Sequence, residues 1–331
     1  MKYAALLLAV AACGDNDTCD PTSDTMCRKL SQYEFFADIA KQTPAEGVTP
    51  YDIETPLFSD YTTKHRFFAL PPGEAATWSD QDAFELPVGT TLIKTFGYGA
   101  EKLETRLLIH GADGWHGSSY VYTGDGTDAT LAEAGTVISA SFTDPSGAAG
   151  TNDYVVPNKN QCKNCHAEHD DIVTPLGPKA RHLNLGDQLQ AMVDHGQLTG
   201  APAADQWPKD PDALDPTTGT LDQRARAFLD INCGHCHNPT GQARTSGLYL
   251  DAFETDAAKW GLCKPPVATG RGSGGLAFDI VPGDPDHSII IYRVSATEPE
   301  IKMPELGRNL VDAEAVQLLR DWITAMPGQC N

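Results

Sequence analysis

Basic residues are scarce in this sequence: 24 Lys and Arg stand against 45 Asp and Glu, which leaves a formal charge of −21. Nucleic-acid binding needs clustered Lys and Arg to displace counterions, so the composition argues against it. The same shortage argues against docking on anionic lipid through a basic patch. No apolar run approaches the roughly 18 residues that a membrane-spanning helix requires. Hydrophobic residues still make up 40% of the 331 residues, which is enough for folded cores, and the length suggests about two domains.

The first of nine cysteines follows a short apolar segment near the start of the chain. Residues 1–3 (MKY) precede an apolar run that ends at Ala12, a pattern typical of a secretory signal. The run ends in VAAC, which also resembles the lipobox of a bacterial lipoprotein. We predict a lipoprotein signal peptide over 1–12, a lipid anchor at Cys13 and a tether over 13–50; an ordinary signal peptide is the alternative. Either form predicts an exported protein, periplasmic or attached to the outer membrane, where disulfides are permitted.

Residues 51–157 contain short segments rich in β-branched and aromatic residues, separated by Gly, Asp and Pro. This pattern is typical of short antiparallel strands. It predicts a β-rich domain that resembles a sandwich. The expected strands are 91–96, 103–109, 118–123, 136–142 and 153–156.

Two segments, Cys162–His166 and Cys233–His237, both read C-x-x-C-H. This is the attachment signature of c-type haem. Two thiols three positions apart form thioethers with the two vinyl groups of one porphyrin, and the histidine that follows binds the iron. The signature therefore predicts two covalently bound haem c groups. It assigns thioether bonds to Cys162, Cys165, Cys233 and Cys236, and iron ligation to His166 and His237.

Zinc binding is the main alternative for two C-x-x-C pairs. However, 68 positions separate Cys165 from Cys233, against roughly 15–20 in common zinc ribbons. Zinc binding would also not explain why a histidine directly follows each pair. A thioredoxin-like redox pair does not need that histidine either. Haem is therefore the favoured cofactor.

Residues 221–331 begin and end with helical patterns, which predict an all-α cytochrome c-like domain around the second motif. Apolar positions near the end follow i, i+4, i+7, i+8, i+11 and i+12, as in an amphipathic helix; they are Val311, Ala315, Leu318, Leu319, Trp322 and Ile323. Met303 is followed by a proline in the preceding loop. This is the usual position of the distal axial ligand in small c-type cytochromes, where a thioether raises the reduction potential. A core residue is the alternative for Met303.

The first motif lies in a shorter segment, 158–200, followed by a proline-rich linker over 201–220. The segment is too short for a complete cytochrome domain, so its haem should pack partly against neighbouring parts of the chain. The whole fold class is thus predicted as α+β and multidomain. The sixth iron ligand of this haem stays open, as does an unfilled coordination position. The candidates are Met192, for which a core role is equally plausible, His182, His195 and His169.

Four cysteines remain after the lipid and haem assignments. Cys19 and Cys27 lie eight positions apart and predict a local disulfide, with two free thiols as the alternative. Cys263 and Cys330 bracket most of the last unit, and we predict a second disulfide between them. A loop of this length gives a bridge worth roughly 4 kcal/mol in the loop-entropy model.

Several short motifs resemble a family of bacterial dihaem c-type cytochromes, many of them lipoproteins and often encoded beside a parallel β-helix protein. The resemblance covers most of the chain from about residue 50, and it implies a dihaem protein with a β-helix protein as a partner. The motifs are Thr55–Tyr61, Lys94–Phe96, Glu104–Arg106, Pro157–Asn158, Pro175–Lys179, Leu183–Asn184 and Asn232–Asn238. A broader class of single-haem domains is similar over Gly247–Asp251, Val281–Pro285 with Ser288, and Met303–Pro304. This second resemblance implies that Cys233, Cys236 and His237 bind haem and that Met303 is its axial ligand.

The leading functional prediction is an exported electron carrier that is held at the membrane only by its lipid. It is not an enzyme in this interpretation. The acidic surface favours a redox partner with a basic docking face. The alternatives are a dihaem peroxidase, the haem subunit of a periplasmic dehydrogenase, and a β-domain that binds a partner or polysaccharide with the haems as its redox output.

Overall fold

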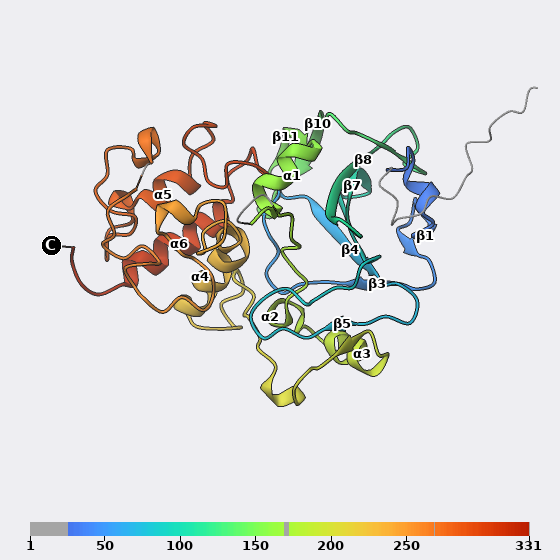
Figure 1. The fold of residues 1–331 in the computed structure, drawn as a ribbon. Helices are drawn as coiled ribbons and strands as arrows, with labels where there is room; N and C mark the ends of the chain where they lie inside the picture. The colour runs from blue at the N-terminus through green and yellow to red at the C-terminus, as the bar shows by residue number, and fades with distance from the viewer. Residues whose placement is uncertain (1–25, 169–171, 268, 331) are drawn as a thin grey trace, which may run out of the picture.

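The computed structural model describes residues 26–168, 172–267 and 269–330 of the chain (Figure 1). Its largest element is a six-stranded antiparallel sheet with the strand order β3-β4-β6-β7-β8-β9. Short turns between β6, β7 and β8 make this part a simple meander. The strands are β3 (Val48–Tyr51), β4 (Thr63–Ala69), β6 (Thr91–Tyr98), β7 (Glu101–Gly111), β8 (Gly114–Tyr122) and β9 (Ala129–Leu131).

Successive side chains of a strand point to opposite faces, so the sheet has two different faces. On one face Ile93, Leu107 and Tyr120 pack in a core cluster with Tyr33 and Phe35 of the N-terminal segment. That segment covers this face with η1 (Leu30–Tyr33), β1 (Phe36–Asp38) and β2 (Thr43–Pro44). The opposite face is left for the segments that carry the first C-x-x-C-H motif.

A two-stranded hairpin of β10 (Thr136–Thr143) and β11 (Ala149–Val156) packs against one end of that opposite face. Its Tyr154 lies in a cluster with Phe96 and Leu103, and the Phe96 and Tyr154 ring centroids are 6.4 Å apart. Strand β11 leads within three residues into α1 (Lys159–His166), which places the first motif beside the sheet.

A third core cluster joins the loop after β4 to the segment after α1. Leu183, Leu189, Met192 and Leu198 are buried there against Phe84. The elements are β5 (Ala76–Thr77) and β12 (Leu198–Thr199), which form a parallel pair, with α2 (Ala180–Leu183), α3 (Gln188–Asp194) and η3 (Ala204–Gln206).

The C-terminal part lies beside the sheet region, and α1 lies between the two (Figure 1). Its core joins Phe228, Leu250, Ile290, Leu319 and Trp322. Its α-helices are α4 (Leu221–Leu229), α5 (Ile289–Val294) and α6 (Ala313–Ala325). Shorter turns are η4 (Asp230–Gly234, a π-helical turn), η5 (Arg244–Ser246), η6 (Gly270–Ser273) and η7 (Pro285–His287).

The predicted fold class is wrong. The structure is mostly β; helix of every kind, the 3-10 and π-helical turns included, makes up 23% of it, and the described residues contain six α-helices. An all-α cytochrome c-like domain is not formed, because 54 residues of turns and short 3-10 segments (235–288) separate η4 from α5 at its centre, where α5 itself has only six residues. The β-region is one large sheet with an accessory hairpin instead of two facing sheets.

Cys263 and Cys330 form a disulfide, with their Cα atoms 5.2 Å apart. It ties the C-terminal end to the loop before η6. Cys27 is buried and disulfide-bonded. Its predicted partner Cys19, the predicted signal peptide and the predicted lipid anchor Cys13 lie outside the described residues. Within the described ranges, no helix has the length and apolar character needed to cross a membrane.

Candidate functional site

The first C-x-x-C-H motif occupies helix α1. The helix begins with a capping box, in which the Asn158 side chain accepts from the Gln161 backbone N–H and the Gln161 side chain accepts from that of Asn158, both at 2.9 Å. Each bond satisfies a donor that the helix start leaves free. The helix lies close to β8: a Cβ on Gly117 would be 3.2 Å from the Cys162 Sγ. Glycine at this position therefore lets the helix hold Cys162 against the sheet.

His166 is oriented by a hydrogen bond at one ring nitrogen. Its Nδ1 lies 3.0 Å from the Thr174 carbonyl oxygen, which accepts the Nδ1 proton. Burial lowers the pKa of His166, which favours the neutral ring. A neutral imidazole with its Nδ1 proton on a carbonyl is the usual form of a metal-binding histidine, with Nε2 left for the metal. His166 thus has the environment that an iron ligand requires.

A pocket, named the first pocket, opens between α1 and the face of the sheet opposite the N-terminal segment. Cys162 and His166 line it, and so do residues of β4, β6, β7 and β8. The segments 176–183 and 230–235 form its remaining sides. Its apolar walls include Leu92, Phe96, Leu108 and Leu176.

The second C-x-x-C-H motif begins in the π-helical turn η4, directly after α4. Thr220 and Gln223 form a capping box that starts α4. The Asn232 side chain donates to the Phe228 carbonyl oxygen at 3.1 Å and accepts from the Phe58 backbone N–H at 2.8 Å. A Cβ on Gly234 would lie 3.1 Å from the Asp251 Cα, so a side chain here would press against the backbone of that neighbouring segment. The turn is therefore held on both sides by the rest of the chain.

A second pocket faces this motif. It is lined by Cys233, Cys236, His237 and Met303, with apolar walls from Leu248, Leu250, Ile289 and Ile290. The His237 Nδ1 lies 3.4 Å from the Ser246 hydroxyl, and burial lowers the pKa of His237 to about 4. The structure therefore brings Met303 to the same pocket as the motif that precedes it by 66 positions.

Hydrogen bonds fix the loop that carries Met303. The Met303 backbone N–H donates to the Arg293 carbonyl oxygen at 3.1 Å. The Arg308 guanidinium donates to the Met303 carbonyl oxygen through Nε at 3.1 Å and Nη2 at 2.7 Å. Both main-chain polar groups of this residue are thus held, and its thioether is left to face the pocket.

The two pockets meet at their motifs. The Cys236 thiol donates to the Asn164 carbonyl oxygen at 3.6 Å. Cys236 also lowers the pKa of Cys165, and Cys165 raises the pKa of Cys236, as expected of two neighbouring thiols. Cys165 lines the second pocket, and His235 lines both pockets. The His235 Nδ1 is buried and has no hydrogen-bond partner within the described ranges. Sequence reasoning gave His235 no role, because its neighbourhood depends on the first motif.

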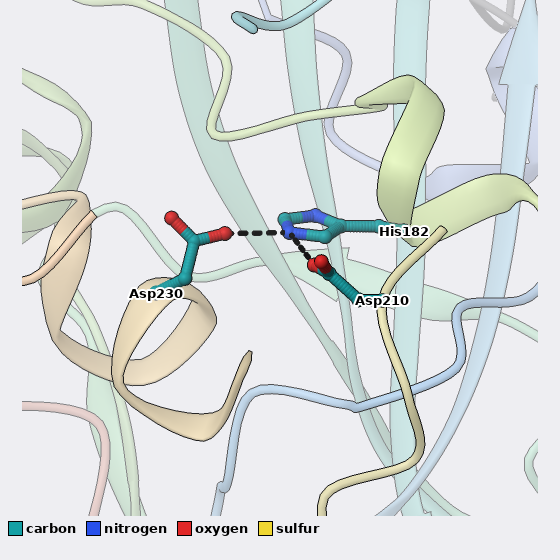
Figure 2. A group of neighbouring side chains, drawn as sticks. All are labelled: His182, Asp210 and Asp230. Carbon is teal, nitrogen blue, oxygen red and sulfur yellow. Dashed lines mark hydrogen bonds and ion pairs between the residues drawn. The ribbon is translucent and has the colours of Figure 1, made fainter. Parts of the chain in front are cut away.

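A buried ion-pair network lies beside this junction (Figure 2). The His182 Nε2 is 3.0 Å from the Asp230 Oδ2 and 3.4 Å from the Asp210 Oδ2. The Arg181 guanidinium donates to both Asp230 oxygens, with Nη2 distances of 3.0 and 2.7 Å. His182 and the two aspartates are close enough to hold a metal ion. Because Arg181 already occupies both oxygens of Asp230, we assign the group to ion pairing.

The predicted sixth ligands of the first motif have different surroundings. His182 lines the first pocket, but its Nε2 is bound in the network above. Met192 is buried in the core cluster beside α2 and does not line the pocket. His195 follows α3 and does not line it either. His169 lies outside the described residues.

Sequence reasoning gave no role to the four cations of the first pocket, which are Lys179 and, on the strands of the sheet, Arg66, Lys94 and Arg106. Each strand cation lies on the face of the sheet that lines this pocket, the face that also carries the apolar Leu92, Phe96 and Leu108. This alternation was visible in the sequence, but the neighbours of each cation depend on the strand register.

No family model matches the chain, and neither a curated protein nor a solved structure matches it.

Proposed function

We propose that the protein is an exported dihaem c-type cytochrome that carries electrons between redox partners at the cell envelope. Each pocket contains cysteine and histidine side chains of a C-x-x-C-H motif. His166 and His237 each have a polar partner at Nδ1, which leaves Nε2 for iron. The apolar walls suit a porphyrin face. The donor set therefore fits one haem c at each motif.

The single observation that carries the proposal is the contact between the two motifs. Cys165 and Cys236 would bond to different porphyrins, yet both line the second pocket, and the Cys236 Sγ lies 3.6 Å from the carbonyl oxygen of Asn164, the residue before Cys165. Haem supplies a one-electron iron couple when it is bound. The chain's own contribution is to hold two such sites side by side, to exclude water with apolar walls and to present His237 and Met303 at one of them. Two adjacent redox sites suit a carrier.

The charge of the chain supports a carrier that meets a basic partner. The formal charge of −21 creates a negative field that attracts a positively charged docking face. Such steering weakens with salt, because the Debye length is about 10 Å at 0.1 M. Anchoring by lipid at Cys13 would keep the carrier at the envelope, and a β-helix protein is one partner that the family resemblance implies.

Electron exchange with a small basic cytochrome c tests the carrier proposal. We expect the reduced protein to transfer electrons rapidly at low salt, with a rate constant that falls steeply as ionic strength rises. An acidic electron-transfer protein used as a control should react slowly and gain speed with salt. The absence of a reversible redox change would contradict the proposal. So would an electron-transfer rate constant that does not depend on ionic strength or on the charge of the partner.

Replacing Met303 tests the ligand assignment of the second pocket. We expect Met303→Ala to abolish the near-infrared band of thioether-ligated ferric haem. The midpoint potential of that haem should fall by on the order of 0.1 V, a fraction of the roughly 0.8 V that axial ligands span. Met326→Ala is the matched control, because Met326 packs on the C-terminal core and does not line the pocket. Retention of the band in Met303→Ala would remove Met303 from the iron.

One observation favours a second candidate, a dihaem peroxidase. A peroxidase requires an iron with an open coordination position. Of the predicted sixth ligands that the structure describes, only His182 lines the first pocket, and its Nε2 is already bound to Asp230. Stopped-flow mixing with hydrogen peroxide separates the candidates. A high-spin haem that is oxidised by peroxide and turned over by an electron donor would favour the peroxidase.

A further inference from the structure

Three cationic side chains form a row across the centre of the sheet. Arg66 of β4 pairs in register with Lys94 of β6, and Lys94 pairs with Arg106 of β7. Residues paired in this way point to the same face, and all three line the first pocket. Like charges directly opposite one another destabilise a sheet. Another interaction must therefore offset this repulsion.

Only the two ends of the row have counter-charges. The Arg66 Nη1 lies 2.7 Å from the Asp52 Oδ1, and the Arg106 Nε lies 2.9 Å from the Glu104 Oε1. Lys94 has no hydrogen-bond or ion-pair partner in the part of the chain that the structure describes; its Nζ lies 5.0 Å from the Phe96 ring centroid. The Arg66 Nη2 is also buried without a partner there. The row therefore has donors for additional negative charge.

An anion in the pocket is needed to keep Lys94 charged. Burial, together with the charge of Arg66, lowers the pKa of Lys94 well below its usual range. Placing a cation in a protein interior costs free energy unless it is paired. A bound carboxylate would pair it, and would satisfy the free Arg66 donor with the same chemistry.

The position of the row fits one end of a porphyrin. Cys162 lies against β8, and the order from there is β7, β6 and β4. At about 4.8 Å between strands, β6 and β4 lie roughly 10 and 14 Å across the sheet from β8. The vinyl groups, which form the thioethers, and the propionates lie at opposite edges of a haem. Lys94 and Arg66 are therefore on the side of the pocket where carboxylates are expected.

We propose that Lys94 and Arg66 bind the two propionate carboxylates of the haem attached to the first motif, a proposal that rests on the proposed function. Leu92, Phe96 and Leu108 lie around the row and suit the apolar ring, so the pocket matches an amphipathic ligand with its acids at one edge. Arg106 is already paired with Glu104, so we assign no propionate to it. Arg66 is paired with Asp52 through Nη1 only, and its Nη2 is left for a propionate.

Lys94→Met in the holoprotein tests this assignment. Removing a cation beside the propionates leaves the ferric state relatively more stable, so the midpoint potential of the first haem should fall. Lys94→Arg, which keeps the charge, should retain the wild-type potential. The matched control is Lys41→Met, because the Lys41 side chain is 79% exposed and the charge change is the same. Arg66→Gln provides a second variant with the same expected direction.

Three outcomes would overturn the assignment. The first is an unchanged first-haem potential in both Lys94→Met and Arg66→Gln. The second is conversion of the first haem to a high-spin spectrum in Lys94→Met, which would make Lys94 an iron ligand. The third is that sulfate binds to the wild-type holoprotein and does not bind to Lys94→Met. Such binding would mean that Lys94 is not occupied by a propionate. Haem staining of the same preparations keeps the two proposals apart: a chain without covalent haem contradicts the proposed function itself.

Discussion

The double variant Cys162→Ser/Cys165→Ser should carry one covalent haem instead of two. Both thiols of the first motif lie at the junction of α1 with the pockets, and each thioether bond needs its own sulfur. Cys233→Ser/Cys236→Ser should lose the other haem, together with the spectral band of the thioether ligand. The measurement is the ratio of haem to protein by pyridine haemochrome after denaturation, because only covalent haem survives that step.

The chain offers a matched control for this experiment. Cys263→Ser/Cys330→Ser also removes two cysteines, but these form a disulfide and line neither pocket. This variant should be less stable and should retain both haems. Two haems in either motif variant, or loss of haem in the disulfide variant, would mean that the cysteine assignment is wrong.

Replacing Arg181 with methionine should destabilise the protein by about 3–5 kcal/mol, because it leaves the Asp230 charge buried without its main partner. The Asp230 side chain is 1% exposed and the Arg181 side chain 3% exposed. Urea unfolding at neutral pH, followed by tryptophan fluorescence, measures the loss. Arg320→Met is the control: its partner Asp286 is 72% exposed, and surface pairs contribute about 0–1 kcal/mol.

The loss in Arg181→Met should depend on pH. Burial alone would raise the pKa of Asp230, but the hydrogen bond from His182 and the charge of Arg181 outweigh it and hold that pKa well below its usual range. A lowered pKa contributes stability that is present above the unfolded value of about 3.9 and disappears as the pH falls through the folded value. Wild type and variant should therefore converge in acid. A constant difference down to low pH would show that lost packing, not charge, explains the effect.

The features that the sequence predicted best depend on residues close together in the chain. The amphipathic pattern near the C-terminus is such a feature. That pattern corresponds to α6, where Ala315, Leu318, Leu319, Trp322 and Ile323 are buried. Here the periodicity of one local segment carries the information.

The features that the sequence did not predict depend on contacts between distant segments. The all-α prediction extended two terminal helices over the loops between them, where short 3-10 turns form instead. The contact of Cys165 with Cys236 joins segments 71 positions apart. The row of Arg66, Lys94 and Arg106 exists only because the registers of β4, β6 and β7 align the three residues. No local period specifies such an alignment.

We propose that Cys162, Cys165, Cys233 and Cys236 hold two haems by covalent bonds. The most direct test is the intact mass of the purified protein in denaturant, after production in a host that matures c-type cytochromes and after treatment with a thiol-alkylating reagent. We expect the polypeptide mass plus two haem groups, with none of these four cysteines alkylated. A mass equal to the polypeptide plus alkyl groups on these cysteines would contradict it.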